Sequence, residues 1–243
     1  MSTPLTEVTP EAVPTLANSA AGGVASKRWQ RTAPAFAGHT VFDDLVWRVQ
    51  ARRQNGTSLA VGVSSPLPRV GTTTVAANLA LRAAELQSDR VLLVDARGNS
   101  GGLLKLFRVA PAPGLAEILS GKLAVGEIEP ISLRENLDLI SAGAECVTGS
   151  LRIHHHLVKE VLESLKRKYS LIVVDLPPAD QLGSTIPLAR NLCGVVLVVG
   201  SESSRPVEVQ RAAQQLEQDG IAVWGTVLNR YRRYIPRWLE RWV

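Results

Sequence analysis

The stretch that decides the fold is Leu59-Ala-Val-Gly-Val-Ser-Ser-Pro-Leu-Pro-Arg-Val-Gly-Thr-Thr-Thr-Val-Ala-Ala-Asn-Leu-Ala80. Its first five residues, Leu59 to Val63, are apolar and predict a buried strand. A turn rich in Ser and Pro follows, and Gly71 ends it. The run from Thr72 to Ala80 favours a helix. Because the free amide groups of a helix N-terminus and the helix dipole point toward one spot, the stretch predicts a cradle for an anion.

This layout is that of a phosphate-binding loop, whose pattern is G-x-x-x-x-G-K-S/T. Two positions depart from the pattern. Pro66 stands where the pattern opens with Gly, and Thr72 stands where Lys should follow Gly71. The loop therefore has the form of a nucleotide-binding loop without its cation. Residues 28–104 contain no lysine, which leaves Arg69 as the local candidate to replace it.

The composition suits a domain built on an aliphatic, buried sheet. Of the 243 residues, 45% are hydrophobic and few are aromatic. No apolar run reaches the roughly 18 residues of a membrane-spanning helix, and no signal peptide is visible. The net charge is +5, and in residues 229–243 five arginines against one glutamate give +4. A tail with this charge is too small to indicate nucleic-acid binding.

Three segments are expected along the chain. Residues 1–37 are rich in Pro, Ala, Thr, Ser and Gly and lack apolar periodicity, which predicts a disordered leader. Residues 38–230 alternate apolar runs with helical patterns and form the folded domain. Residues 231–243 interleave arginines with aromatic residues. This basic-aromatic tail could dock on the body, on a partner, or on an anionic membrane surface.

The alternation within the folded domain predicts the fold class. Strands are expected at 59–63, 91–95, 137–140, 171–175, 194–199 and 221–228, with helices at 41–53, 72–80, 114–119, 151–168 and 206–218. We therefore predict an α/β fold, a doubly wound, mainly parallel sheet with helices on both faces. The helix at 41–53 aligns Asp44, Arg48 and Arg52, and this face is either solvated or a subunit interface.

Two acidic residues end predicted strands. Asp95 closes Val-Leu-Leu-Val-Asp, and Asp175 closes Leu-Ile-Val-Val-Asp. In open α/β sheets, ligands sit outside the carboxyl ends of the strands, which is where the loop at 64–74 also lies. Two carboxylates facing a phosphate site typically hold Mg²⁺ and position a nucleophile. Thr73 would supply a hydroxyl to the metal.

Several separated motifs agree in order and spacing with one known family. They are the loop at 64–80, Val91–Asp95, Pro113–Gly121, Glu135–Gly143, Tyr169–Pro178 and Gly225–Arg230. Together they resemble the bacterial tyrosine kinases of capsule and exopolysaccharide systems, which belong to the MinD/ParA-like P-loop ATPases. The resemblance covers residues 40–230, most of the chain.

The resemblance implies a set of site residues and cofactors. It implies ATP or ADP with Mg²⁺, catalytic roles for Asp95 and Asp175, and metal binding by Thr73 and the same two acids. The other implied positions are Arg69, Gly71, Thr72, Thr73 and Thr74 at the phosphates, Asn229 and Arg230 at adenine, and Tyr231 and Tyr234 as phosphoacceptors.

The departures from the family pattern are concentrated in the loop. The family loop is roughly Pro-Gly-Glu-Gly-Lys-Ser-Thr, whereas this chain has Pro68-Arg-Val-Gly-Thr-Thr-Thr74. The second acid and the Arg of the family's Asp-x-Asp-x-Arg are also lost after Asp95. Losing one charge-assisted phosphate contact costs about 1.5–3 kcal/mol of binding, and losing a donor aimed at developing charge costs about 10²–10³ in rate. Nucleotide binding is therefore expected to be weakened or lost.

Three functions remain open from the sequence. The first is a pseudokinase that regulates exopolysaccharide or capsule synthesis by docking to a membrane chain-length regulator. The second is an active tyrosine autokinase of the same pathway, with Arg69 as the phosphate cation. The third is a MinD-like regulatory ATPase that associates with membranes. The family resemblance also implies homo-oligomers and a cytoplasmic location at the inner face of the membrane.

Overall fold

The computed structural model describes residues 6–8, 39–53, 56–98, 102–143 and 154–231. Within these ranges one sheet carries the strands β1 (Thr6–Val8), β2 (Leu59–Ser64), β3 (Val91–Asp95), β4 (Ile131–Arg134), β5 (Leu137–Ile140), β6 (Leu171–Asp175), β7 (Gly194–Gly200) and β8 (Val223–Asn229). The α-helices are α2 (His39–Gln50), α3 (Thr72–Leu86), α4 (Gly102–Phe107), α5 (Leu115–Leu119), α6 (His155–Lys166), α7 (Ile186–Arg190) and α8 (Pro206–Gln218). None of the described helices is long and apolar enough to span a bilayer.

The strand order places the loop strand at the centre of the sheet. The order is β1-β8-β7-β2-β6-β3-β5-β4, and every pairing is parallel except that of β4 with β5. Strand β2 lies between β6 and β7, while the chain continues from β2 through α3 to β3. The sheet order thus reverses direction beside β2, the position where open α/β sheets bind ligands.

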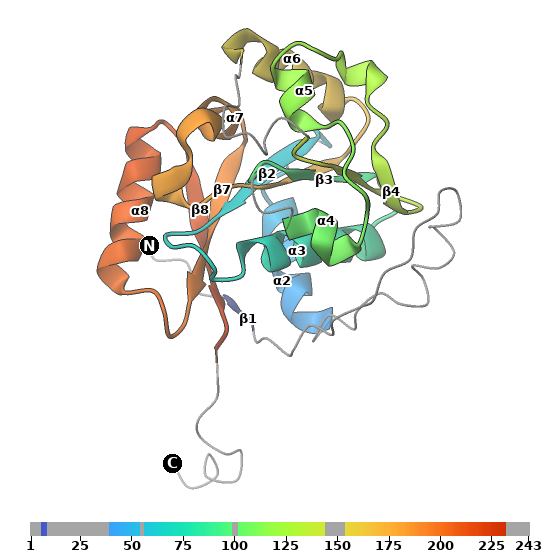
Figure 1. Cartoon of the computed structure of the whole chain (residues 1–243). Coiled ribbons are helices and arrows are strands. Elements are labelled where there is room, and N and C mark those ends of the chain that lie inside the picture. Colours follow the sequence, from blue (N-terminus) through green and yellow to red (C-terminus); the bar gives the residue numbers. More distant parts are fainter. Residues whose placement is uncertain (1–5, 9–38, 54–55, 99–101, 144–153, 232–243) are drawn as a thin grey trace, which may run out of the picture.

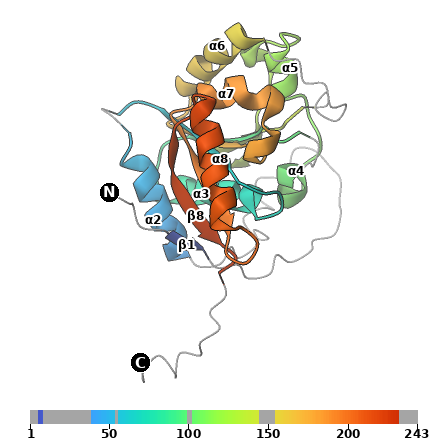
Figure 2. The ribbon, with the colours of Figure 1, turned by 90° about the vertical axis from the view of Figure 1, so that its left-hand side faces the viewer.

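Helices cover both faces of the sheet, as the alternation predicts (Figure 1). Alternate residues of β2 separate into two cores, with Val61 and Val63 on one side and Ala60 on the other. The first core is closed by α2, α3 and α4, and the second by α5, α6, α7 and α8. Figure 2 shows α8 and α2 on opposite sides of β8. The α/β fold class with a mainly parallel, doubly wound sheet is confirmed.

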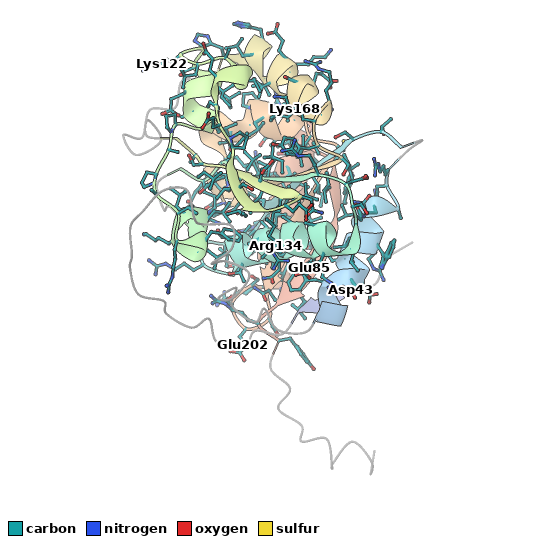
Figure 3. All side chains as sticks on the ribbon, turned by 90° about the vertical axis from the view of Figure 1, so that its right-hand side faces the viewer. Asp43, Glu85, Lys122, Arg134, Lys168 and Glu202 are labelled. Atoms are coloured by element: carbon teal, nitrogen blue, oxygen red, sulfur yellow. The ribbon has the colours of Figure 1, made fainter. Side chains whose placement is uncertain are left out.

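A polar network ties α2 to the helix that follows the loop. Arg82 of α3 donates Nη2 to Asp43 Oδ2 of α2 at 3.0 Å and contacts the same carboxylate through Nε. Its Nη1 lies 3.0 Å from Glu85, which also pairs with Arg134 of β4. Figure 3 shows Asp43, Glu85 and Arg134 in one row on this side of the molecule. The position of α2 is therefore coupled to α3 by charge as well as by apolar packing.

The prediction of a disordered leader over 1–37 is wrong at Thr6–Val8. These three residues form β1, parallel to the end of β8, with Glu7 opposite Leu228 and Val8 opposite Asn229. The edge of β8 offers unpaired backbone groups, and any extended segment can satisfy them. Residues 1–5 and 9–38 lie outside the described residues, so the rest of this prediction stays untested.

Most expected elements occur at or near their predicted ranges. The helix predicted at 151–168 is α6, His155–Lys166, and residues 151–153 lie outside the described part. The sequence pattern does not predict strand β4 or helices α4 and α7. All three are short, and β4 is an antiparallel edge strand whose partner, β5, supplies its pairing. The tail at 232–243 also lies outside the described residues.

Candidate functional site

The loop after β2 has the strand–turn–helix geometry of an anion cradle. Gly71 is the N-cap of α3 with φ +94°, and its carbonyl accepts the amide of Val75 at 3.0 Å. The start of the loop is held from two sides. The Ser64 hydroxyl donates to the Pro177 carbonyl at 2.7 Å, and the Ser65 carbonyl accepts the amide of Ala179 at 2.8 Å. The loop therefore has a fixed shape at both ends.

Thr72 occupies the position where a lysine would reach the phosphates. Its side chain is buried, with 2% of the residue exposed, and its hydroxyl has no hydrogen-bond partner among the described residues. A buried hydroxyl without a partner is uncommon, because desolvation of a polar group is costly unless a bond compensates for it. Thr72 therefore leaves an unused donor and acceptor at the helix N-terminus.

The two acids predicted from the strand ends lie side by side. Asp95 of β3 and Asp175 of β6 are register partners, and Asp175 is also opposite Val63 of β2. Both residues are almost fully buried. Since β2, β3 and β6 run parallel, both carboxylates stand at the same edge of the sheet as the loop. The geometry brings together the acids that the sequence analysis proposed as a pair.

Asp175 is the electrostatically unusual member of the pair. Burial, opposed by the nearby Thr73 hydroxyl and reinforced by the Asp95 charge, raises the pKa of Asp175 to about 8. The approach of Thr73 does not meet hydrogen-bond geometry at either oxygen, and both oxygens are unpaired within the described structure. Without a cation the Asp175 carboxyl is therefore protonated at neutral pH.

Asp95 shows the same tendency with more compensation. Burial raises the pKa of its carboxyl, and the backbone amide of Arg97 opposes this by donating to Oδ1 at 3.0 Å. The two acids thus differ in environment. Asp95 is held by the turn that follows β3, whereas Asp175 has oxygens left over for a ligand.

The donor set fits a hard cation better than it fits a triphosphate. Two carboxylates and the Thr73 hydroxyl are oxygen ligands of the kind that Mg²⁺ prefers, and the free oxygens of Asp175 suit that role. No cluster of three or more His, Cys, Asp or Glu side chains that could hold a metal occurs among the described residues. Mg²⁺ bound by two acids therefore needs further oxygens from water or phosphate.

The phosphate side of the site lacks a buried cation in the loop itself. Arg69 is exposed and has φ +64°, a left-handed conformation that is unfavourable for a residue with a Cβ atom. Thr74 is half-buried, and its carbonyl accepts the Asn78 side-chain amide at 2.8 Å. The predicted phosphate positions 69 and 71–74 thus lie together around the start of α3, but without a lysine.

The residues predicted at the adenine lie at the end of β8. The Asn229 side chain is buried and donates Nδ2 to the Val70 carbonyl at 2.8 Å, a contact that the sequence analysis missed. No local pattern could have revealed it, because the two residues are 159 positions apart. Arg230 is exposed with φ +61°, and Tyr231 is half-buried. The second phosphoacceptor candidate, Tyr234, lies outside the described residues.

Sequence relatives of this chain are bacterial tyrosine kinases. It is 30% identical over 175 residues to the tyrosine-protein kinase Ptk of Acinetobacter johnsonii and 29% identical over 168 residues to the tyrosine-protein kinase Etk of Escherichia coli K12. These matches cover 71% and 69% of this chain but 24% and 23% of those proteins. The chain therefore spans about a quarter of the length of the curated relatives it matches. No family model matches the chain.

Solved structures agree with this relationship. The kinase domain of Escherichia coli Etk superposes with a TM-score of 0.68 at 24% identity, covering 83% of this chain and 80% of that one. MinD from Pyrococcus horikoshii, solved with Mg-ADP, superposes with a TM-score of 0.61 at 26% identity, covering 76% of each chain. The shared fold, the paired acids and the sequence relatives lead to one conclusion: the chain belongs to the P-loop family of bacterial tyrosine-kinase domains, whose fold is also that of the MinD ATPases.

Proposed function

We propose that this protein is a pseudokinase of the bacterial tyrosine-kinase family. It has kept the fold and the acid pair but has lost efficient phosphoryl transfer. One observation carries the proposal: Thr72, a buried residue with an unpaired hydroxyl, occupies the position of the phosphate-binding lysine. Phosphoryl transfer depends almost entirely on positioning and charge stabilisation, and the lysine provides both at the β- and γ-phosphates.

The state of the acids supports the same proposal. Burial, reinforced by the charge of the adjacent Asp95, raises the pKa of Asp175 to about 8. A protonated Asp175 binds Mg²⁺ poorly, because the proton and the metal compete for the same oxygens. Metal and nucleotide are thus both disfavoured, and they would have to bind together to compensate for each other's charges.

The role in the cell follows by analogy with the relatives. We propose that the domain acts at the inner face of the cytoplasmic membrane, where it docks to a membrane chain-length regulator and modulates exopolysaccharide or capsule synthesis. Homo-oligomers and contact of the basic-aromatic tail with the membrane surface belong to the same proposal. The bond network between α2 and α3 would couple a partner on α2 to the loop region.

An active tyrosine autokinase is the competing function, and the observation that favours it is that both acids are retained as neighbours at the loop edge of the sheet. In that case Arg69 would supply the phosphate cation from the rim of the loop, and Tyr231 or Tyr234 would accept the phosphoryl group. Arg69 is exposed, so it would have to fold back over the phosphates to do so.

The two functions are separated by incubating the purified full chain with Mg²⁺ and ATP and probing for phosphotyrosine. The proposal predicts no ATP-dependent signal above that of the Asp175→Ala variant. A signal that requires ATP and disappears in Asp175→Ala would establish the active kinase instead. The variants Tyr231→Phe and Tyr234→Phe would then identify the acceptor.

A further inference from the structure

The loop after β2 is joined to the end of β8 by a buried hydrogen bond. The Asn229 side chain, at the last residue of β8, donates Nδ2 to the Val70 carbonyl at 2.8 Å. Asn229 is 5% exposed and Val70 is 1% exposed, so water does not compete for the bond. Among the described contacts this bond ties the middle of the loop, not its ends, to the sheet.

The backbone around Val70 shows why the bond matters. Arg69 and Gly71 flank Val70 with φ values of +64° and +94°, and a residue other than glycine is disfavoured in this region. Such conformations persist when surrounding contacts determine them. The Val70 carbonyl, between these two residues, is held by the Asn229 amide. The strained turn is therefore retained by a side chain that arrives from another strand.

The side chain of Asn229 also limits the space around Gly71. A Cβ atom added at Gly71 would lie 2.2 Å from Asn229 Nδ2 and 3.5 Å from Asn229 Cγ. The amide of Asn229 thus occupies the space that a side chain at position 71 would need. Position 71 therefore requires glycine for two reasons, the positive φ and the close approach of the Asn229 side chain.

The backbone of Asn229 is also held in place. Its carbonyl accepts the amide of Ser201 at 2.9 Å, so the end of β8 is joined to the turn that follows β7. On the same side, Gly200 lies against Val70, since a Cβ at Gly200 would meet Val70 Cγ1 at 3.2 Å. The ends of β7 and β8 therefore form a rigid support against which Val70 rests.

We propose that Asn229 is a positioning residue that holds the loop in its ligand-binding shape through the Val70 carbonyl. In this role the side-chain nitrogen of Asn229 donates its hydrogen bond to the loop and not to the adenine ring of a nucleotide. The loop is then preformed in this protein without nucleotide, and the support comes from β8. This role does not depend on the proposed loss of catalysis, because the bond acts on the loop whether or not phosphates bind.

The experiment is hydrogen exchange on the full chain without nucleotide, comparing a peptide at 65–73 with a reference peptide at 91–95. Asn229→Asp keeps the shape but replaces the amide donor by an oxygen that repels the Val70 carbonyl. Asn229→Ala removes the donor without repulsion and serves if the first variant does not fold. Both are expected to speed exchange of the loop amides by about tenfold or more, while exchange in β3 changes little.

Asn78→Asp is the matched control. Asn78 is also buried, and it also donates its amide to a backbone carbonyl at 2.8 Å, but its acceptor is Thr74 within α3. We expect this variant to leave the exchange of the loop peptide within about twofold of wild type, since its bond lies inside the helix. Loop exchange that stays at the wild-type rate in both Asn229 variants would overturn the proposal. So would an Asn78→Asp variant that loosens the loop as much.

Discussion

Replacing Asp175 by Asn should stabilise the metal-free protein, and the gain in stability should increase as the pH rises. Asp175 is fully buried, and its two carboxylate oxygens have no hydrogen-bond partner among the described residues. Burial raises the pKa of Asp175 from 3.8 to about 8 in the folded protein. The folded state then binds more protons than the unfolded chain across this interval, so wild-type stability falls as pH rises from about 4 to about 8.

The magnitude follows from the width of that interval. The free energy of unfolding should fall by up to about 1.4 kcal/mol per pH unit because of this one group, and level off above pH 8. Over the whole window the contribution reaches about 6 kcal/mol. Asn has nearly the same shape and no charge, so Asp175→Asn removes the slope and leaves an offset that does not vary with pH.

Urea denaturation in the presence of a chelator, at intervals from pH 5 to pH 9, measures this difference. The advantage of the variant should grow steadily up to about pH 8 and then stay constant. Asp138→Asn is the control, because Asp138 is also buried but accepts hydrogen bonds from Tyr169 at 2.8 Å and Arg90 at 2.6 Å. That substitution should destabilise the protein. If the difference between wild type and Asp175→Asn does not vary with pH, Asp175 ionises normally and the site has a compensating cation.

Two further substitutions test the packing around the site and beneath it. Gly71→Ala should destabilise the protein by about 2 kcal/mol or more, since Ala adopts φ +94° poorly and its Cβ would meet Asn229. In a double-mutant cycle with Asn229→Ala, measured by urea denaturation, the double variant should lose less stability than the sum of the two single variants. Simple additivity would contradict the contact. Tyr169→Phe should cost about 1–3 kcal/mol, because it removes a buried hydrogen bond to Asp138 and leaves that carboxylate with Arg90; a thermal unfolding curve that matches wild type would contradict this.

The central part of the site could be predicted from local sequence alone. The apolar run of β2, the turn ended by Gly71 and the helix beginning at Thr72 are consecutive, and each has a strong local preference. Asp95 and Asp175 could also be predicted as a pair, because buried parallel strands are short apolar runs and their carboxyl ends share one edge. The absence of the loop lysine could be recognised from the phosphate-loop pattern alone.

Other features depend on contacts between distant segments and had no local pattern. Strand β1 is three residues long and exists because β8, more than 200 residues later, offers a free edge. The bond from Asn229 to Val70 joins residues 159 positions apart. The unpaired oxygens of Asp175 likewise depend on what surrounds them, and the sequence showed an acid at a strand end without showing its environment.

We infer that Thr72, in place of the loop lysine, removes the largest single contribution to nucleotide binding from a loop that keeps its helix N-terminus and its acid pair. Calorimetric titration of Mg-ADP into the wild type and into Thr72→Lys tests it most directly. We predict weak or undetectable heat for the wild type, with Kd above about 1 mM, and an affinity gain of about 10- to 100-fold for Thr72→Lys, because one charge-assisted phosphate contact contributes about 1.5–3 kcal/mol. Micromolar binding by the wild type that Thr72→Lys does not improve would contradict the claim.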